Sequence, residues 1–435
     1  MKAMRVLHLC HNHPDLQPGG TEVLARGLFR ELRDRHGVEG MFLAAVTRAH
    51  RPRRPGTLLQ SVGGAPDEML VWLGHFDRFA MSQPDTYGLA SLAPLVASAD
   101  PDIVHVHHLL MFGPETVDLI RQTAPRARLV FTAHDFFPIC PQEGQLFTTD
   151  GRLCRGPSLD GCARCFPGRA PDEFAMRDLQ MRDLLSDFDR VLVPSAFARG
   201  RYTAAGWPAD RLALMPNGVA AADSAAPPPR PRAAADGRRD RFAFFGHINR
   251  YKGSTVLLEA SRILSEEGVA HRVALHGGTA YQPDAFLERF NAALEAAPRA
   301  RHRGAYTRDD LGALMAEADW VVVPSVWWEN APLVILEAFR HGRPVICGDV
   351  GGMAEMVRDG VDGLHAPVGD PVGLAAAMRR AAADPALWHR LASGIQAPDT
   401  IAQVADRHFS LYQELLERAA PGDRAAAAAP VAVPA

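Results

Sequence analysis

Short apolar runs alternate with longer segments of helical periodicity along most of the chain. The runs rich in Val, Ile, Leu and Phe are residues 4–9, 102–107, 128–134 and 190–195 in the first half, and 241–246, 272–277, 320–325 and 343–348 in the second. Such runs are typical of parallel strands that are buried on both faces and joined by helices. The pattern predicts an α/β protein with two doubly wound parallel sheets, each in a Rossmann-like domain.

Breaks in this pattern divide the chain. Residues 218–240, rich in Ala, Pro and Arg and without periodicity, predict an exposed linker. It would separate an N-terminal domain over residues 1–217 from a C-terminal domain over residues 241–396, with a ligand in the cleft beyond the carboxyl ends of the strands. Apolar positions three and four apart predict a helix over residues 397–418 that packs back on the N-terminal domain. The low-complexity residues 419–435 predict a disordered tail.

Charge and hydropathy narrow the classes of partner. A formal net charge of −3 and a sequence pI near 6.7 give no global basic field, so nucleic acid is not an expected partner. No window approaches about 18 consecutive apolar residues, and the apolar run at the start is too short for a signal peptide, so we expect a cytoplasmic protein. Two interpretations stay open for the Arg-rich residues 48–56: contact with anionic lipid head groups, giving peripheral attachment to the inner face of the cell membrane, or a solvated loop.

Two glutamates, Glu329 and Glu337, flank an apolar run in "PSVWWENAPLVILEAF". Asn330 suits an N-cap and Pro332 a first helical turn, so a helix is predicted from about residue 331, with Glu329 in the preceding loop. Eight helical residues span about 12 Å, and a helix N-terminus attracts anions. A nucleotide sugar fits this arrangement, with its sugar at Glu329, its diphosphate at the helix start and its ribose at Glu337. The alternative is a surface Glu329, and a Glu337 that faces solvent or pairs with Arg340.

The residues that follow strengthen the first interpretation. They are Gly342-Arg343-Pro344-Val345-Ile346, Gly351-Gly352, Glu355 and Gly360-Val361-Asp362-Gly363-Leu364. Together with the glutamate pair, this ordered set resembles the signature of the retaining glycosyltransferases of family 4, which have the GT-B fold. The resemblance covers residues 5 to about 418. It implies that Glu329 lies near the transferred sugar and that Glu337 binds the ribose. Many members have Glu-Gly-Phe-Gly where this chain has Glu-Asn-Ala-Pro, so the sugar preference does not carry over.

A basic loop forms the second candidate element. In "FFGHINRYKG", Lys252 follows a predicted strand and precedes a helix, which suits contact with a phosphate. It matches the lysine of the family element GRxxxxKG. The arginine of that element is replaced by His247, and Arg250 is the expected substitute. The alternative is a solvated Lys and Arg at a helix start.

Two further candidates lie in the first half. Gly19 and Gly20 precede a predicted helix and would let the backbone approach a phosphate or sugar, although a tight strand-to-helix turn explains them equally well. The resemblance implies that this loop faces the nucleotide sugar. His134, at the end of a predicted strand, matches a family histidine that contacts the transferred sugar. The alternative for His134 is a loop histidine bonded to Asp135.

Histidines also cluster in "HVHH". Alternation along a strand places His105 and His107 on one face. With His108, we interpret them as satisfied core groups or acceptor-side groups rather than metal ligands.

Four cysteines crowd into a predicted loop over residues 136–170. They are Cys140, Cys154, Cys162 and Cys165. In a reducing compartment, the two-residue spacing of the last pair suits tetrahedral thiolate ligation of a structural zinc ion. The alternatives are reduced, buried thiols or a redox pair. Family members with an HDF…C…CxxC pattern resemble this region, where a metal would anchor the loop beside the acceptor site.

The resemblance implies transfer of a glycosyl group, with retention, from a UDP- or GDP-sugar to an acceptor hydroxyl in cell-surface polysaccharide or glycolipid synthesis. Lys252, with Arg250 and the backbone around Asn330, Ala331 and Leu333, would stabilise the leaving diphosphate, and Glu329 and His134 would position the sugar. From the resemblance we expect no catalytic Mg²⁺ and no other cofactor for catalysis. The acceptor is unknown: a lipid-linked glycan, a saccharide or a small molecule. A GT-B epimerase or phosphorylase, and a non-catalytic nucleotide-sugar-binding subunit, are the alternatives.

Overall fold

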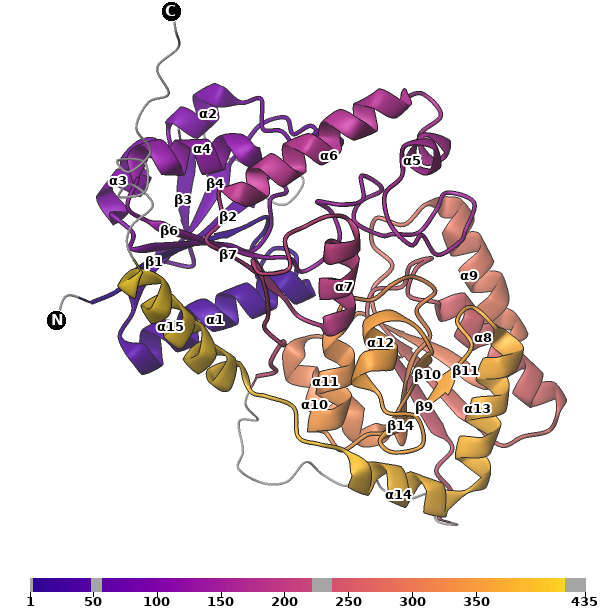
Figure 1. Cartoon of the computed structure of the whole chain (residues 1–435). Coiled ribbons are helices and arrows are strands. Elements are labelled where there is room, and N and C mark those ends of the chain that lie inside the picture. The colour runs from indigo at the N-terminus through magenta and orange to yellow at the C-terminus, as the bar shows by residue number, and fades with distance from the viewer. Residues whose placement is uncertain (1–2, 48–56, 221–236, 419–435) are drawn as a thin grey trace, which may run out of the picture. The chain divides into compact units, whose positions relative to one another are not determined.

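The computed structural model describes residues 3–47, 57–220 and 237–418 (Figure 1). The Arg-rich segment, the predicted tail and most of the predicted linker lie outside the described residues. Contacts divide the chain into two units: residues 1–194, 198–220 and 400–435 form the first, and residues 195–197 and 221–399 form the second.

The first unit is built on an eight-stranded sheet in the order β3-β4-β2-β1-β5-β6-β7-β8. Its strands are β1 (Arg5–Cys10), β2 (Glu39–Val46), β3 (Leu59–Val62), β4 (Ala65–Trp72), β5 (Ile103–Val106), β6 (Arg128–Thr132), β7 (Arg190–Val193) and β8 (Leu212–Leu214). All neighbouring pairs are parallel except β3 with β4, which lies at one edge. The apolar runs of the first half form the central strands β1, β5, β6 and β7, which confirms those predictions.

Eight helices among the described residues belong to this unit. They are α1 (Gly20–His36), α2 (Thr86–Ala90), α3 (Ala93–Ala99), α4 (Gly113–Thr123), α5 (Leu159–Cys165), α6 (Pro171–Ser186), α7 (Ala196–Ala204) and the last helix, α15 (Ile401–Glu417). Thr400 caps α15, since its side chain accepts from the Gln403 N–H, and the helix therefore begins at Ile401. α15 packs along α1 (Figure 1). Gly27 of α1 permits this packing, because a Cβ there would lie 3.3 Å from Ile401 Cγ1.

The second unit holds a six-stranded, wholly parallel sheet in the order β11-β10-β9-β12-β13-β14. Its strands are β9 (Arg241–Phe245), β10 (Arg272–His276), β11 (Ala300–Gly304), β12 (Trp320–Val323), β13 (Val345–Gly348) and β14 (Gly363–Ala366). The connecting helices are α8 (Ser254–Glu266), α9 (Asp284–Ala296), α10 (Arg308–Glu317), α11 (Leu333–Arg340), α12 (Gly351–Met356), α13 (Pro371–Ala383) and α14 (Pro385–Gly394). The four apolar runs predicted here are β9, β10, β12 and β13.

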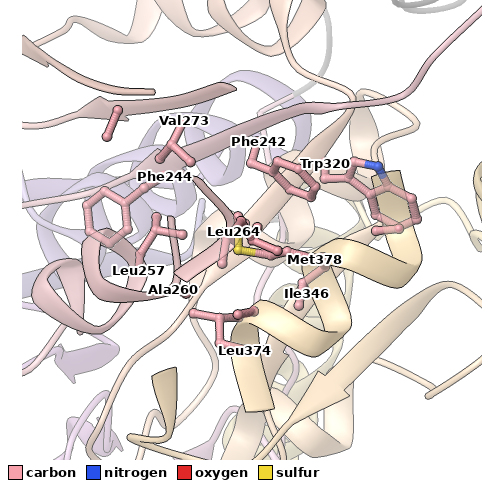
Figure 2. Close-up of a cluster of buried hydrophobic side chains, with 14 of the residues drawn as sticks. Phe242, Phe244, Leu257, Ala260, Leu264, Val273, Trp320, Ile346, Leu374 and Met378 are labelled. Atoms are coloured by element: carbon pink, nitrogen blue, oxygen red, sulfur yellow. The ribbon is translucent and has the colours of Figure 1, made fainter. Parts of the chain in front are cut away.

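Both faces of this second sheet are buried, as the near-continuous apolar runs predict. Phe242 and Phe244 of β9 point to one face, where they pack with residues of α8 and α13 such as Leu257 and Met378 (Figure 2). The intervening Ala243 belongs to a second cluster on the opposite face, with residues of α10 and α11. Two doubly wound parallel α/β units are thus present, which confirms the predicted fold class.

Strand order sets where a ligand can bind in each unit. In a doubly wound sheet the connections leave a crevice at the carboxyl ends of the two strands where the winding direction reverses. That point lies between β1 and β5 in the first sheet and between β9 and β12 in the second. The candidate residues are described below for each unit by itself.

Candidate functional site

Two loops meet at the reversal point of the second unit. One follows β9 and ends at Gly253, the N-cap of α8, and the other follows β12 from Pro324. Gly253 has a φ of 70°, and a Cβ there would lie 1.9 Å from the Pro324 carbonyl oxygen. The N–H of Val326 donates to the Tyr251 carbonyl oxygen at 2.9 Å. Only glycine allows so close an approach, so residue 253 fixes the two loops against each other.

Glu329 lies at the centre of this junction and is 7 % exposed. Its Oε1 atom accepts from Lys252 Nζ at 2.7 Å, from the Ser325 hydroxyl at 2.7 Å and from Trp327 Nε1 at 2.9 Å. Burial acts to raise the pKa of Glu329, but the Lys252 ammonium and these hydrogen bonds hold that pKa below its ordinary value. Glu329 is therefore an ionised carboxylate. Since all three donors bind Oε1, Oε2 is the atom left to accept from a ligand.

Lys252 is oriented from its own loop as well. The side chain of Asn249 accepts from the backbone N–H groups of Tyr251 and Lys252, both at 2.9 Å. The Lys252 ammonium lies 5.5 Å from the centre of the Trp327 ring, which stacks on Tyr251. The structure thus brings together Lys252 and Glu329, which lie 77 positions apart in the sequence. A half-buried cation beside an ionised carboxylate can bind a phosphate and a sugar hydroxyl in one place.

The two other basic candidates of this loop are exposed. His247 Nε2 lies 2.9 Å from the Ala280 carbonyl oxygen and 3.0 Å from Gln282 Nε2. The Arg250 guanidinium lies over the Tyr251 ring, 5.0 Å from its centre.

Glu337 lies within α11, as predicted. Its side chain is 15 % exposed and accepts from Arg308 at 3.2 Å. The predicted alternative partner, Arg340, does not appear in this ion pair. Burial raises the pKa of Glu337, and Arg308 opposes that rise in part. As a carboxylate, Glu337 can accept hydrogen bonds from two vicinal hydroxyls.

The start of α11 differs from the prediction. The helix begins at Leu333 and its N-cap is Pro332, in extended conformation, rather than Asn330. Asn330 is buried, and its side-chain oxygen accepts from the Ser195 hydroxyl at 3.1 Å within the second unit, so it is not available to cap the helix. Ala331 and Leu333 are partly exposed at the helix start.

The Gly351-Gly352 turn contacts the backbone of the loop that carries Glu329. Gly351 has a φ of 63°, which disfavours other residues. The Gly352 N–H donates to the Glu329 carbonyl oxygen at 2.8 Å, and a Cβ on Gly352 would lie 1.9 Å from the Asn330 carbonyl oxygen. The paired glycines of the sequence therefore serve a close backbone contact that positions Glu329.

A second polar cluster lies at the reversal point of the first unit. His11 follows β1, and its Nε2 lies 3.0 Å from Glu22 Oε1 in the first turn of α1. His108 follows β5, and its Nε2 lies 2.7 Å from Asp135 Oδ2 after β6. The His11 and His108 rings are 4.4 Å apart. His108, not His134, is the partner of Asp135.

Sequence reasoning missed His11 and Glu22 as members of this cluster. Glu22 stands three positions after Gly19, and a Cβ on Gly19 would lie 2.4 Å from Glu22 Oε2. Gly19 therefore makes room for a buried carboxylate beside its own loop, while Gly20 is exposed. A histidine directly after the first strand and a glutamate at the next helix start are the signals that could have located this pair.

His105 and His107 are fully buried and hydrogen-bonded, in agreement with the prediction of satisfied core groups. His105 bonds to the Tyr412 hydroxyl at 2.6 Å and to the Thr132 hydroxyl at 2.7 Å. Burial lowers the pKa of both imidazoles well below its ordinary value. His134 is half-buried at the end of β6.

The four cysteines are free thiols in one neighbourhood of the first unit. The pKa of Cys140 is raised to about 11, mainly by burial and in smaller part by Cys154 and Cys162. The pKa of Cys162 is raised too, first by burial and also by Cys154 and Cys165. A redox-active thiol has a lowered pKa, so these values do not favour the redox pair. Among the described residues, the group of three ligand atoms within 4.8 Å of one another is His8, His105 and His107, so no three cysteine sulfurs are that close.

No helix among the described residues is both long and apolar enough to cross a membrane.

Comparisons with known proteins agree with this arrangement. The model of Glycosyltransferase Family 4 matches residues 18–223, and that of Glycosyl transferases group 1 matches residues 239–384. A D-inositol 3-phosphate glycosyltransferase of Nocardia farcinica is 28 % identical over 376 residues, which cover 81 % of this chain and 76 % of the relative.

Solved structures are similar over nearly the whole chain. Sucrose-phosphate synthase of Thermosynechococcus elongatus superposes with a TM-score of 0.71 at 19 % identity, covering 95 % of this chain and 99 % of that one. Anabaena HepE, in complex with UDP and glucose, superposes with a TM-score of 0.66 at 16 % identity, and the match covers 94 % of this chain and 100 % of that one.

Proposed function

The chain belongs to the glycosyltransferases of family 4 and has the GT-B fold, and on this premise we propose that it transfers a glycosyl group from a nucleoside diphosphate sugar to an acceptor hydroxyl, with retention at the anomeric carbon. The nucleotide is UDP or GDP in this proposal. The acceptor belongs to cell-surface polysaccharide or glycolipid synthesis.

The observation that carries the proposal is the contact of Lys252 with Glu329 at the reversal point of the second sheet. A diphosphate leaving group gains negative charge as the glycosidic bond breaks, and a fixed ammonium stabilises that charge in the transition state. Glu329, held ionised with Oε2 directed away from its three donors, accepts from a hydroxyl of the transferred sugar and favours positive charge at the anomeric carbon.

The α11 helix supplies the rest of the donor site in this proposal. Backbone N–H groups at its start bind phosphate oxygens, and Glu337, the fifth residue of the helix, accepts from the ribose hydroxyls. An ionised Glu329 is unable to donate a proton, which fits a reaction in which the leaving diphosphate takes the proton of the acceptor. No catalytic metal is part of this scheme.

Turnover with a panel of UDP-, GDP- and ADP-sugars tests the proposal, with release of the nucleoside diphosphate as the readout and the anomeric configuration of the product determined by NMR. One donor is expected to be consumed, with a product that keeps the donor's anomeric configuration. An inverted product would refute retention. Release of isomerised sugar nucleotide without an acceptor would favour an epimerase, and binding without turnover a non-catalytic subunit.

We propose separately that the four cysteines bind a structural zinc ion. Four thiols within one loop and its adjoining helix α5 would provide the ligand set, and Cys154 with Cys162 raises the pKa of Cys140 while Cys154 with Cys165 raises that of Cys162. Because the sulfurs are further apart than ligands of one ion, zinc would draw the loop together. Analysis of protein purified without a His-tag should find about one zinc per chain, and less than about a tenth of that would refute the site.

A further inference from the structure

Histidines of the first unit form a buried stack that the proposed reaction does not use. His8 of β1 pairs in register with His105 of β5. The rings of His105 and His107 are 4.0 Å apart, and those of His8 and His107 are 5.3 Å apart. His134, two residues after the end of β6, continues the stack at 5.7 Å from His107.

A metal ion does not explain this stack, although ligand atoms of His8, His105 and His107 lie within 4.8 Å of one another. The rings of His105 and His107 are stacked face to face, with an interplanar angle of only 28°, which is a poor arrangement for two imidazoles that bind one ion through their ring edges. Both nitrogens of His105 also have hydroxyl partners. The histidines are therefore held by hydrogen bonds rather than by a shared ion.

Those hydrogen bonds link three imidazoles in a chain. His8 Nδ1 lies 3.0 Å from His107 Nε2, and His107 Nδ1 lies 3.5 Å from His134 Nε2, at the long end of the hydrogen-bond range. Burial lowers the pKa of His8 and of His134 to about 3 each, and that of His107 well below its ordinary value. Each ring is thus neutral at pH 7, with one N–H donor and one acceptor nitrogen.

The inner end of these linked hydrogen bonds, at His8, determines the direction in which the N–H groups point. His8 Nε2 is buried and has no hydrogen-bond partner among the described residues. If the N–H groups pointed inward, His8 Nε2 would carry a buried donor with nothing to accept from it. Buried unpaired donors are rarer than unpaired acceptors, and an unpaired buried group costs about 1–3 kcal/mol. The N–H groups therefore point outward: His8 Nδ1–H donates to His107, and His107 Nδ1–H donates to His134 Nε2.

We propose that His8 and His107 are positioning residues that hold His134 as its Nδ1–H tautomer, so that His134 presents a hydrogen-bond donor at the carboxyl edge of the first sheet. His134 Nε2 is occupied by His107 and does not act as a base. The groups around His134 are His11, Glu22, His108 and Asp135, and a neutral N–H among them suits a ligand oxygen. That this oxygen belongs to a sugar rests on the proposed function, whereas the tautomer does not.

The tautomer is measured directly by long-range ¹H–¹⁵N correlation spectra of the full chain labelled with ¹⁵N-histidine. His134→Gln identifies the His134 signals by their loss. In the unmodified chain at pH 7, His134 is expected to show a protonated Nδ1 and an unprotonated Nε2. A protonated Nε2 would overturn the proposal, and this result needs no donor sugar, because the tautomer itself is read in the unmodified chain.

Three variants separate positioning from simple packing. His107→Leu removes the donor to His134 and should shift His134 toward its Nε2–H tautomer, with kcat/KM lower by about tenfold or more. His107→Asn places an amide N–H close to the former Nδ1 and should restore the tautomer and part of the activity. His408→Leu is the matched control. His408 is buried and its ring lies 5.6 Å from that of His105, but its Nδ1 bonds to the Val404 carbonyl oxygen, so it takes no part in the hydrogen bonds that link His8, His107 and His134.

The control should leave the His134 tautomer unchanged. An unchanged tautomer in folded His107→Leu would overturn the proposal. Absence of any glycosyl transfer, with the tautomers as expected, would count against the proposed function and leave the positioning role standing.

Discussion

Removal of the Lys252 ammonium by Lys252→Met should affect stability and turnover together. Glu329 would keep its buried position and lose its cation, while the Ser325 hydroxyl and the Trp327 N–H would still bind Oε1. Breaking a buried pair costs about 3–5 kcal/mol. The side chains of Lys252 and Glu329 are 29 % and 8 % exposed, and the remaining donors offset part of the loss. We therefore expect the free energy of unfolding to fall by about 1–3 kcal/mol.

The pH dependence of this loss of stability shows whether the ion pair with Glu329 is its cause. The pKa of Glu329 is lowered in the folded chain from an ordinary value of 4.5, so the ion pair contributes stability above that value, and this contribution is lost as the pH falls through the folded pKa. The difference in stability between Lys252→Met and the unmodified chain should be largest near pH 7 and should shrink toward pH 4.

Urea denaturation followed by tryptophan fluorescence measures this effect, with Glu329→Gln and the double variant completing a double-mutant cycle. Arg250→Met removes an exposed cation from the same loop and should change stability by no more than about 0.5 kcal/mol. In turnover, Lys252→Met should lower kcat by about 10²–10³-fold, and Lys252→Arg by less. A coupling energy below about 0.5 kcal/mol together with an unchanged kcat would refute the reasoning.

Three other variants test separate parts of the account. Glu337→Ala should raise the dissociation constant of the nucleotide sugar by about ten- to a hundredfold, measured by calorimetry, since a hydrogen bond to a charged group contributes about 1.5–3 kcal/mol; an unchanged constant would contradict ribose binding. Gly352→Ala should lower the melting temperature and the activity, because its Cβ would lie 1.9 Å from the Asn330 carbonyl oxygen, at a cost of about 1–3 kcal/mol. Gly312→Ala, in the helix α10 with its nearest neighbour at 3.6 Å, should be neutral or stabilising, and equal effects of the two would contradict the close contact. Cys162→Ser with Cys165→Ser should abolish zinc binding while Cys347→Ser in β13 retains it, and equal zinc contents would contradict the cysteine site.

The central strands could be predicted from the sequence, whereas strands at or near the sheet edges could not. The predicted runs are apolar on both faces because helices cover both sides of each sheet. β11 instead reads Ala-Arg-His-Arg-Gly at the edge of its sheet, and β4 carries Glu68, which is buried and bonded to Arg26, Arg30 and His13. Charged residues in such strands give no apolar run, and their pairing depends on partners distant in the sequence.

The candidate site was predictable only where it is local. The spacing of Glu329 and Glu337 indicates a loop residue and a helix residue, and the structure places them so. The prediction of Asn330 as the N-cap was wrong, because its side chain bonds to Ser195 instead. The direct contact of Lys252 with Glu329 follows from the pairing of β9 with β12, which no local pattern contains. The same holds for the hydrogen-bonded histidines, because His8 lies in β1 while His107 and His134 follow the ends of the neighbouring strands β5 and β6.

The most direct test of the central claim is calorimetric titration of the full chain with UDP, GDP and ADP in turn. The account predicts that one of these nucleoside diphosphates binds with a stoichiometry near one, and that Glu337→Ala and Lys252→Met each weaken that binding. Failure of all three to bind the folded, unmodified chain would contradict a nucleotide-sugar site at α11 and the Lys252–Glu329 pair.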